Sequence, residues 1–466
     1  LYNLELHQRS LRQLMGLGVF RFVNIRFVQA ADSVLDARIL LTPLPRRSLG
    51  AEIRGVSKSN NFAGPGLSVN YSNLNLLGGA ELLRLGLSGS YEALVGRSRE
   101  QASSWEAGLD AELLLPRLSG PFPFSKPQNQ YVPRTSLGMG FNYLDRTDAF
   151  SLSSLRLHFG YQWNPRAELR HRLNPVSFSF FSLGRISPEI EGLLEQGVFQ
   201  RRGLFEQFII GSEYSLFYNS QQKENRISRH DVYANLNLDV SGNLASALFS
   251  LIPGATRDEE GAYSLFGQAF SQYARADIDL RYYRRLDSRS QLATRLIVGA
   301  GVPYGNADQL PYLKLFSIGG VNSIRAFRPR SLGPGTYALP DSLAGGFNLY
   351  QTGDLKLELN AEYRFNLGSV FRGAVFADAG NIWRWRENEN TPGGEFRLDR
   401  FYEQLALGAG LGLRIDATFF VLRFDFAIPL AIPYSGRDGF FDPIQPGKRE
   451  WRREYLVFNL AIGYPL

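Results

Sequence analysis

The chain has 466 residues, of which 44% are hydrophobic and 20% charged, and its formal net charge is +7 at pH 7. The absence of cysteine excludes disulfides and thiolate metal sites. No run of about 18 apolar residues occurs, which excludes a transmembrane helix but not a membrane barrel, whose strands are apolar on one face alone. The excess of positive charge suits anionic lipid headgroups, and we expect no nucleic-acid partner.

Residues 1–46 differ from the rest of the chain. Leucines at helical spacing between positions 4 and 14 predict a helix, and two strands are expected to follow it, at 19–29 and 34–42. The result is part of a small α+β module, and Pro45 marks its end. The first residue is not Met, so we expect a processed product or a piece of a longer protein.

From about residue 48 onward, one pattern repeats. Between 355 and 366 every odd position is apolar and every even position is polar or charged, and 232–240 repeats this alternation. A period of 2 predicts β-strands with one apolar and one polar face. Sixteen such strands are expected to start near residues 48, 64, 80, 103, 135, 150, 167, 206, 230, 272, 290, 355, 371, 403, 419 and 454.

The connections between these strands mostly alternate between short turns and long loops, with one break at 117–134, which is long where a short turn is due. The long ones include 184–205, 241–271, 306–354, 384–402 and 431–453. Long strands with this alternation are typical of outer-membrane barrels. The sequence therefore predicts an all-β transmembrane barrel of sixteen antiparallel strands over 47–466. A soluble protein with several half-buried sheets is the alternative.

In a barrel the polar strand faces point into the lumen and the apolar faces meet lipid. The charged residues expected in the lumen are Glu358, Glu362, Asp378, Arg423 and Asp425. The aromatic residues expected near strand ends, at the two membrane interfaces, are Tyr91, Tyr282, Tyr363 and Phe365.

The long segment 306–354 is rich in Gly and Pro and carries Arg325 between apolar residues. A buried arginine needs a carboxylate partner, because leaving either charge alone away from water costs several kcal/mol. Asp378, within 376–381, is the candidate partner. We therefore predict that this loop folds back into the barrel and is held there by Arg325. An arginine on a solvated loop is the alternative.

These features resemble the BamA/TamA superfamily of outer-membrane assembly factors, also called the bacterial surface antigen family. In that family a sixteen-stranded barrel follows periplasmic POTRA domains. The V/I-R-G-F/Y motif of its sixth extracellular loop is matched at Ile324, Arg325, Ala326 and Phe327. The F/G-x-D-x-G motif of its strand thirteen is matched at Phe376, Asp378 and Gly380.

The resemblance implies that Arg325 contacts Asp378 together with Glu362, in what we call the lumenal latch. It also implies that residues 1–46 are the C-terminal part of the last POTRA domain. Ala326 stands where the family usually has Gly, and alanine disfavours a positive φ. The chain ends in Leu rather than an aromatic residue, and Pro465 cannot donate a ladder hydrogen bond, so the end of the last strand is expected to be frayed or displaced.

The function that the resemblance implies is protein insertion into, or translocation across, the bacterial outer membrane, with the N-terminal part in the periplasm. The proposed route is a lateral seam between strand one (48–57) and strand sixteen (454–466), where a client strand adds to an exposed sheet edge. The residues expected to weaken this seam are Gly50, Gly55, Gly463 and Pro465. Expected partners are the lipid bilayer, client β-barrel or secreted proteins, and a periplasmic assembly-module partner.

Two other functions remain open, namely a two-partner-secretion exoprotein transporter and a passive porin or structural barrel. The four histidines are scattered, and neither a phosphate-binding loop nor a nucleophile elbow occurs. The glycines between 408 and 412 lie inside a strand pattern, where they either thin the lumen wall or leave room for the folded-in loop. We therefore expect no catalytic residue, no metal and no cofactor, with a lumenal carboxylate site as the alternative.

Overall fold

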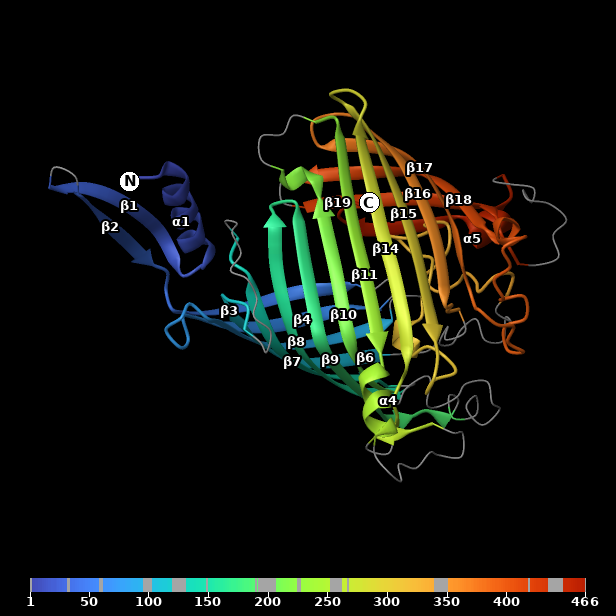
Figure 1. Cartoon of the computed structure of the whole chain (residues 1–466). Helices are drawn as coiled ribbons and strands as arrows, with labels where there is room; N and C mark the ends of the chain where they lie inside the picture. Colours follow the sequence, from blue (N-terminus) through green and yellow to red (C-terminus); the bar gives the residue numbers. More distant parts are fainter. Residues whose placement is uncertain are drawn as a thin grey trace.

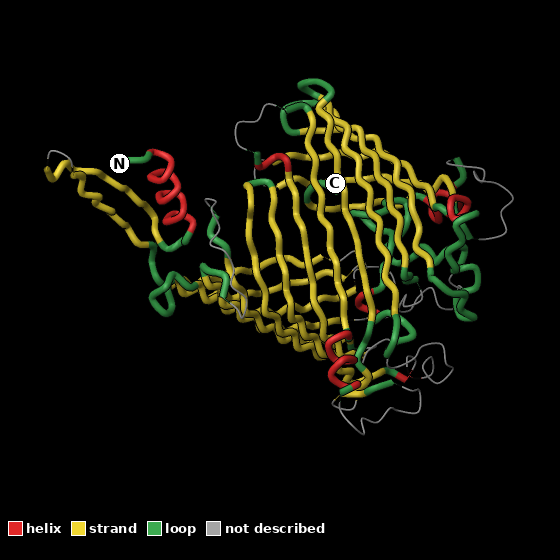
Figure 2. The backbone as a smooth tube through the Cα atoms, viewed as in Figure 1, coloured by secondary structure: helices red, strands yellow, loops and turns green. Residues whose placement is uncertain are grey.

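The computed structural model shows a small N-terminal module beside one large, strongly curved sheet (Figures 1 and 2). None of the helices in the described part of the chain is long and apolar enough to cross a membrane. The residues that the structure describes are 2–31, 34–57, 62–94, 103–119, 131–147, 150–188, 191, 207–223, 228–251, 262–265, 268–338, 351–417, 420–434 and 447–465.

The N-terminal module contains α1 (Leu4–Gly16), β1 (Phe20–Ala31) and β2 (Val34–Pro43). The helix begins where the Asn3 side chain accepts a hydrogen bond from the Leu6 amide at 3.1 Å, because a polar N-cap satisfies one of the free amides of the first turn. β1 and β2 pair antiparallel and α1 packs beside β1, so the predicted helix and two strands are confirmed.

The large sheet contains sixteen strands, each antiparallel to its neighbours, as the alternation predicted. Their bounds are β3 (Arg47–Ser57), β4 (Phe62–Leu74), β5 (Leu82–Leu94), β6 (Ser103–Leu115), β7 (Arg134–Arg146), β8 (Phe150–Arg166), β9 (Leu169–Ile186), β10 (Gln207–Asn219), β11 (His230–Ser241), β14 (Tyr273–Arg285), β15 (Ser290–Pro303), β16 (Leu355–Asn366), β17 (Phe371–Trp383), β18 (Ala406–Ala417), β19 (Phe420–Ala431) and β20 (Val457–Ile462). Every strand starts within three residues of its predicted position.

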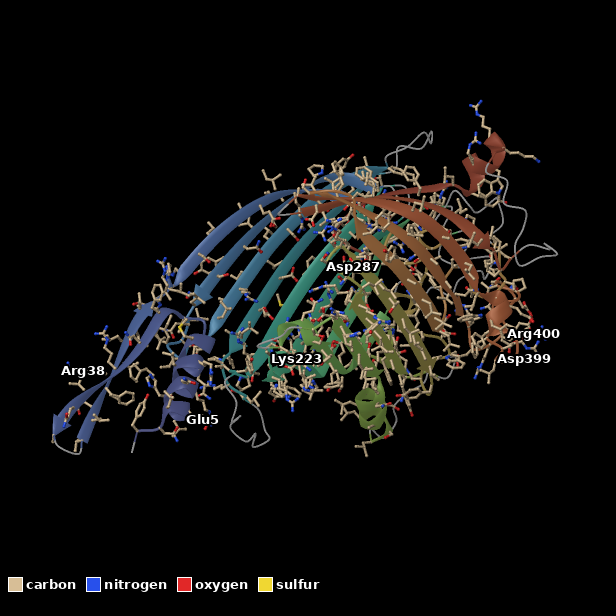
Figure 3. The ribbon with its side chains drawn as sticks, turned by 90° about the horizontal axis from the view of Figure 1, so that it is seen from above. Glu5, Arg38, Lys223, Asp287, Asp399 and Arg400 are labelled. Atoms are coloured by element: carbon tan, nitrogen blue, oxygen red, sulfur yellow. The ribbon has the colours of Figure 1, made fainter. Side chains whose placement is uncertain are left out.

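The remaining elements lie in the connections. They are η1 (Ser220–Gln222), α4 (Asn243–Ser250), β12 (Ser264–Leu265), β13 (Gln268–Ala269), η2 (Tyr312–Lys314), η3 (Phe401–Gln404) and α5 (Arg449–Tyr455). In Figure 3 the N-terminal module, where Glu5 and Arg38 are labelled, lies on the opposite side of the view from the β17–β18 connection, where Asp399 and Arg400 are labelled.

The two faces of the sheet differ in chemistry, as a period of 2 requires. The inner face, defined as the one that carries residues 306–338, holds buried charged residues such as Glu358 and Arg414. The outer face is apolar: in β3 the side chains of Leu49 and Ile53 are 73% and 82% exposed. A sheet that buries its charges and exposes its aliphatic residues is arranged opposite to a soluble sheet, which argues against the soluble alternative.

The two edges of the sheet are β3 and β20, and no backbone pairing joins them among the described residues. β20 is short, since its six residues pair only with residues 422–427 of β19. The prediction that strand sixteen runs from 454 to 466 is wrong at both ends. Its start lies in α5, and Gly463, with φ of 88°, turns the chain away from the ladder after Ile462.

Candidate functional site

The site is built on the loop between β15 and β16. An isolated bridge between Phe316 and Gly353 closes the loop at its base, with N–O distances of 2.8 and 2.9 Å. Gly319 and Gly320 then turn the chain with φ of 96° and 101°. A Cβ at Gly319 would lie 2.3 Å from the carbonyl oxygen of Arg328, so the turn has room only for glycine.

Arg325 sits at the tip of this turn and is fully buried. Its Nε and Nη2 donate to the two carboxylate oxygens of Asp378, both at 2.8 Å, and its Nη1 donates to Glu362 at 2.5 Å. Its backbone amide also donates to Asp378, at 3.1 Å. A bidentate guanidinium–carboxylate pair fixes orientation as well as distance. The structure thus brings together the three residues of the predicted latch.

The latch is part of a larger buried charge network on the inner face. Glu362 also accepts from Arg364 at 2.8 Å and lies 3.1 Å from Arg414. Asp425 joins Arg414, at 2.8 Å, to Arg423, at 3.2 Å. Glu362 and Asp425 therefore each face more than one guanidinium, which offsets the desolvation of these charges.

The apolar residues of the two motifs pack around the arginine. The guanidinium carbon of Arg325 lies 3.5 Å from the centroid of the Phe376 ring, a cation–π contact. Ile324, Ala326 and Phe327 are buried in the same cluster as Phe376. The matched motif residues therefore form one packed unit rather than two separate features.

Three glycines of the facing strands make space for this unit. A Cβ at Gly408 would lie 2.5 Å from the Ala326 Cβ, and one at Gly410 would lie 2.4 Å from the Phe376 ring. A Cβ at Gly380 would lie 2.3 Å from a carbonyl oxygen of β16. The glycines of β18 thus leave room for the loop, as the sequence predicted. Ala326 has no positive φ, so the alanine fits the tip without strain.

A second anchor holds the first part of the loop and was missed from the sequence. Lys314 donates to Asp239 at 2.6 Å and lies 3.4 Å from Glu213. Arg275 donates to the Lys314 carbonyl at 2.9 Å and lies over the Phe316 ring. All of the strand residues involved occupy inner-face positions, but the alternation does not show which of them the loop will meet.

The latch also touches the edge strand. The side-chain amide of Asn459 in β20 donates to the carbonyl of Arg325 at 2.9 Å. Beyond Gly463, the Tyr464 ring lies 4.6 Å from the guanidinium carbon of Arg364. The last residues thus turn toward the charge network, as the expected displacement of this end implied, and Pro465 is buried.

The predicted seam residues lie on the two edges without forming a common site. Gly50 is on the inner face of β3 with open space beside it, and Gly55 pairs with Pro65 of β4. Gly463 ends β20 rather than weakening its middle. The structure therefore does not bring these glycines together with Pro465.

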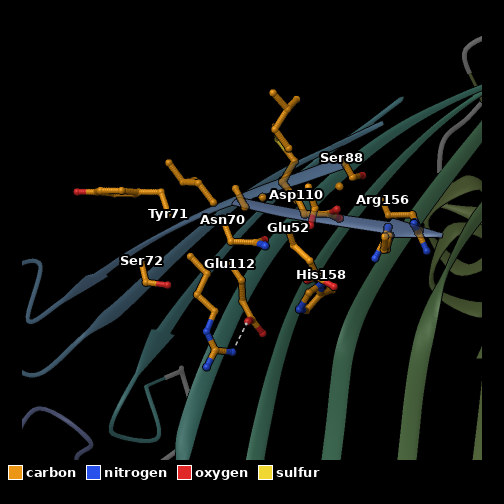
Figure 4. A pocket seen from close by; sticks show the side chains of 18 residues that line it. Glu52, Asn70, Tyr71, Ser72, Ser88, Asp110, Glu112, Arg156 and His158 are labelled. Atoms are coloured by element: carbon orange, nitrogen blue, oxygen red, sulfur yellow. Dashed lines mark hydrogen bonds and ion pairs between the residues drawn. The ribbon is translucent and has the colours of Figure 1, made fainter. Parts of the chain in front are cut away.

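The inner face under β3–β8 is hollow. An open cavity of about 790 Å³ lies there. Figure 4 shows Glu52, Asn70, Asp110 and Arg156 among the side chains that line it. An ion pair of 3.4 Å between Arg84 and Glu112 crosses its wall. The inner face under β3–β8 is thus polar and open, while the loop contacts inner-face residues of strands from β10 and β11 to β20.

This geometry defines the class: a large antiparallel sheet with a polar inner face, onto which a long loop is fastened by buried charges. Residues 124–463 match the model of the Omp85 superfamily domain, which is more than half of the chain. The chain therefore belongs to the Omp85 superfamily, and the resemblance found from the two motifs is confirmed.

The solved structures to which the chain is similar are distant in sequence. The chain is similar to BamA from Haemophilus ducreyi lacking POTRA domains 1–3, with 14% identity, a TM-score of 0.59, and coverage of 98% of this chain and 78% of that one. CdiB from Acinetobacter baumannii matches with 14% identity and a TM-score of 0.49, over 96% of this chain and 66% of that one. The first likeness supports the fold alone.

Proposed function

We propose that the sixteen strands close into a barrel in the bacterial outer membrane and that the protein inserts or translocates client proteins there. The apolar outer face and the buried charges of the inner face support a lipid-facing exterior and a polar lumen. A sheet in lipid must also pair its edges, because lipid cannot satisfy free backbone amides. The N-terminal module then lies in the periplasm as the C-terminal part of a POTRA domain.

The observation that carries the proposal is the weak edge next to the latch. β20 offers six paired residues, whereas β18 and β19 share eleven paired positions. A short edge strand opens more easily, and its exposed amides and carbonyls can template a client strand. The Asn459 contact ties this edge to Arg325, so the folded-in loop supports the edge from the inside. This activity needs neither a catalytic residue nor a cofactor.

The docked position of the loop favours a route through the seam over a route through the lumen. The loop is held by two separate anchors, at Lys314 and at Arg325, and its tip is buried. A two-partner-secretion route or a porin that used the side of the lumen filled by the loop would require the release of both anchors. A large, stable conductance with the loop intact would favour the porin.

The test locks the seam with a disulfide in a chain that has no cysteine of its own. One cysteine replaces Leu49 in β3 and the other replaces Leu460 in β20, both exposed leucines of the edge strands. The control pair, Leu411→Cys with Phe426→Cys, joins exposed residues that are already paired between β18 and β19.

Oxidation of the edge pair should abolish insertion of a client barrel into liposomes, and reduction should restore it. The control pair should have no effect on insertion. If the oxidised edge pair supports insertion as fast as the reduced form, the seam proposal is wrong.

A further inference from the structure

The helix α4 follows β11 in the connection to β14, at the end of the sheet opposite the short β10–β11 turn (Figure 1). Gly242, with φ of 82°, redirects the chain, and its amide donates to the Ile210 carbonyl at 2.8 Å. The helix reads Asn-Leu-Ala-Ser-Ala-Leu-Phe-Ser and carries no charge. Its polar residues are Asn243, Ser246 and Ser250, and the other five are apolar, so an apolar side of this helix needs a core or a membrane to cover it.

One side of α4 packs on the outer face of the sheet. Ile209 of β10 contacts Leu310 of the inner loop, so it points inward, and its neighbour Phe208 points outward. Phe208 is buried with Ala245 of α4 and with Phe270. The partly buried residues around this cluster include Phe178, Phe180, Ile210, Phe249 and Tyr263. The helix is therefore seated on the same face that carries the exposed aliphatic residues.

The opposite side of α4 is uncovered. Leu244, Leu248 and Leu251 are 58%, 55% and 77% exposed. Positions i, i+4 and i+7 lie along one side of a helix, so the three leucines form one apolar stripe. The stripe continues the outer face of the preceding strand, where Leu238 and Val240 are also exposed.

We propose that α4 is a membrane-embedded flank of the sheet, with its leucine stripe in contact with lipid acyl chains near one surface of the bilayer. This rests on the proposed function, in which the outer face meets lipid. Two observations select lipid over a protein partner or a second copy. The stripe is continuous with the outer face of β11, and the helix offers neither a charge nor a long polar side chain to orient a protein partner.

The test uses single cysteines labelled with a fluorophore that lipid-borne nitroxides quench. Leu248→Cys reports the stripe in the reconstituted full chain. Val298→Cys, on the outer face of β15 and similarly exposed, reports whether the strands themselves meet lipid. Asp287→Cys, in the short β14–β15 turn, reports the aqueous side, and the buried Ala245→Cys should not label.

The expected result is strong quenching at 248 by nitroxides placed high on the acyl chain, strong quenching at 298 by deeper ones, and little at 287. Quenching at 298 without quenching at 248 would overturn the membrane placement of α4 and leave the proposed function standing. If, in addition, Leu248→Cys formed an intermolecular disulfide, a second copy of the chain would be the partner that covers the leucine stripe. Absence of quenching at both sites would overturn both ideas.

Discussion

Replacing Arg325 with Ala removes the centre of the latch while leaving its carboxylates in place. Asp378 would keep two hydrogen bonds, from Asn360 at 3.0 Å and from the backbone amide of residue 325 at 3.1 Å, and would lose the two side-chain donors of Arg325. Glu362 would keep Arg364 and Arg414. The main penalty therefore falls on Asp378, and breaking a buried pair on one side costs about 3 kcal/mol.

A loss of about 3 kcal/mol corresponds to about a 100-fold rise in the population of the undocked loop. Hydrogen exchange of the amides between 318 and 330 measures this population directly, because exchange follows local opening. Arg328→Ala is the matched control, since Arg328 lies in the same turn but is exposed. It should leave exchange unchanged.

The double variant Arg325→Ala with Asp378→Ala distinguishes loss of the Arg325–Asp378 interaction from a general loosening of the loop. Removing both charges leaves no orphaned carboxylate at 378, so the double variant should open less than the sum of the two single changes. If the effects simply add, or if Arg325→Ala exchanges no faster than Arg328→Ala, the latch does not hold the loop.

Four further outcomes follow from the contacts around the loop. Lys314→Met should raise exchange in 306–316 about fivefold, without releasing 324–327, because it removes about 1 kcal/mol of partly screened ion pairing. Equal loosening of both parts would show that the two anchors act as one. Gly408→Val should undock the tip, since its Cβ meets Ala326, and trypsin should then cut the loop. Burial acts to raise the pKa of Glu81, but hydrogen bonds from backbone amides of its short turn hold that pKa below the ordinary value of 4.5. The amides of this turn should therefore exchange faster as the pH falls below 4.5. In Glu81→Gln this pH-dependent loss of protection should be absent. Asn459→Ala should speed hydrogen exchange in β20 about fivefold, because it removes one hydrogen bond that contributes about 1 kcal/mol. Unchanged exchange in β20 would show that this contact does not stabilise the strand.

The strands could be predicted because they depend on local information, whereas the latch joins residues 53 positions apart and was predicted from its two motifs and the family that they resemble. A period of 2 over 355–366 predicts both that the segment is a strand and which of its residues lie on each face, whatever the neighbouring strands are. The contact of Arg325 with Asp378 could be proposed because a buried guanidinium has few acceptable partners, and an acidic residue stood at an inner-face position nearby.

What could not be predicted depends on the path of the loop and on the ends of the chain. Lys314 meets Asp239, one of many inner-face carboxylates, only because η2 places it there. Residues 454 and 455 were assigned to strand sixteen, but they end α5, whose sequence Arg-Glu-Trp-Arg-Arg-Glu-Tyr lacks a period of 2. The leucine stripe on α4 was not predicted, because only the length of the connection 241–271 entered the prediction.

The Asn459 contact gives the loop a role beyond filling the sheet. Its acceptor is the carbonyl of Arg325, so it exists only while the tip is docked, and the docked tip in turn requires Asp378 and Glu362. Because coupling between two equilibria is reciprocal, a docked tip favours a paired β20 to the same extent that a paired β20 favours a docked tip. The edge that opens for a client in the proposed function is thus coupled to a loop that two charge clusters hold in place, so that opening the edge and loosening the tip become one process.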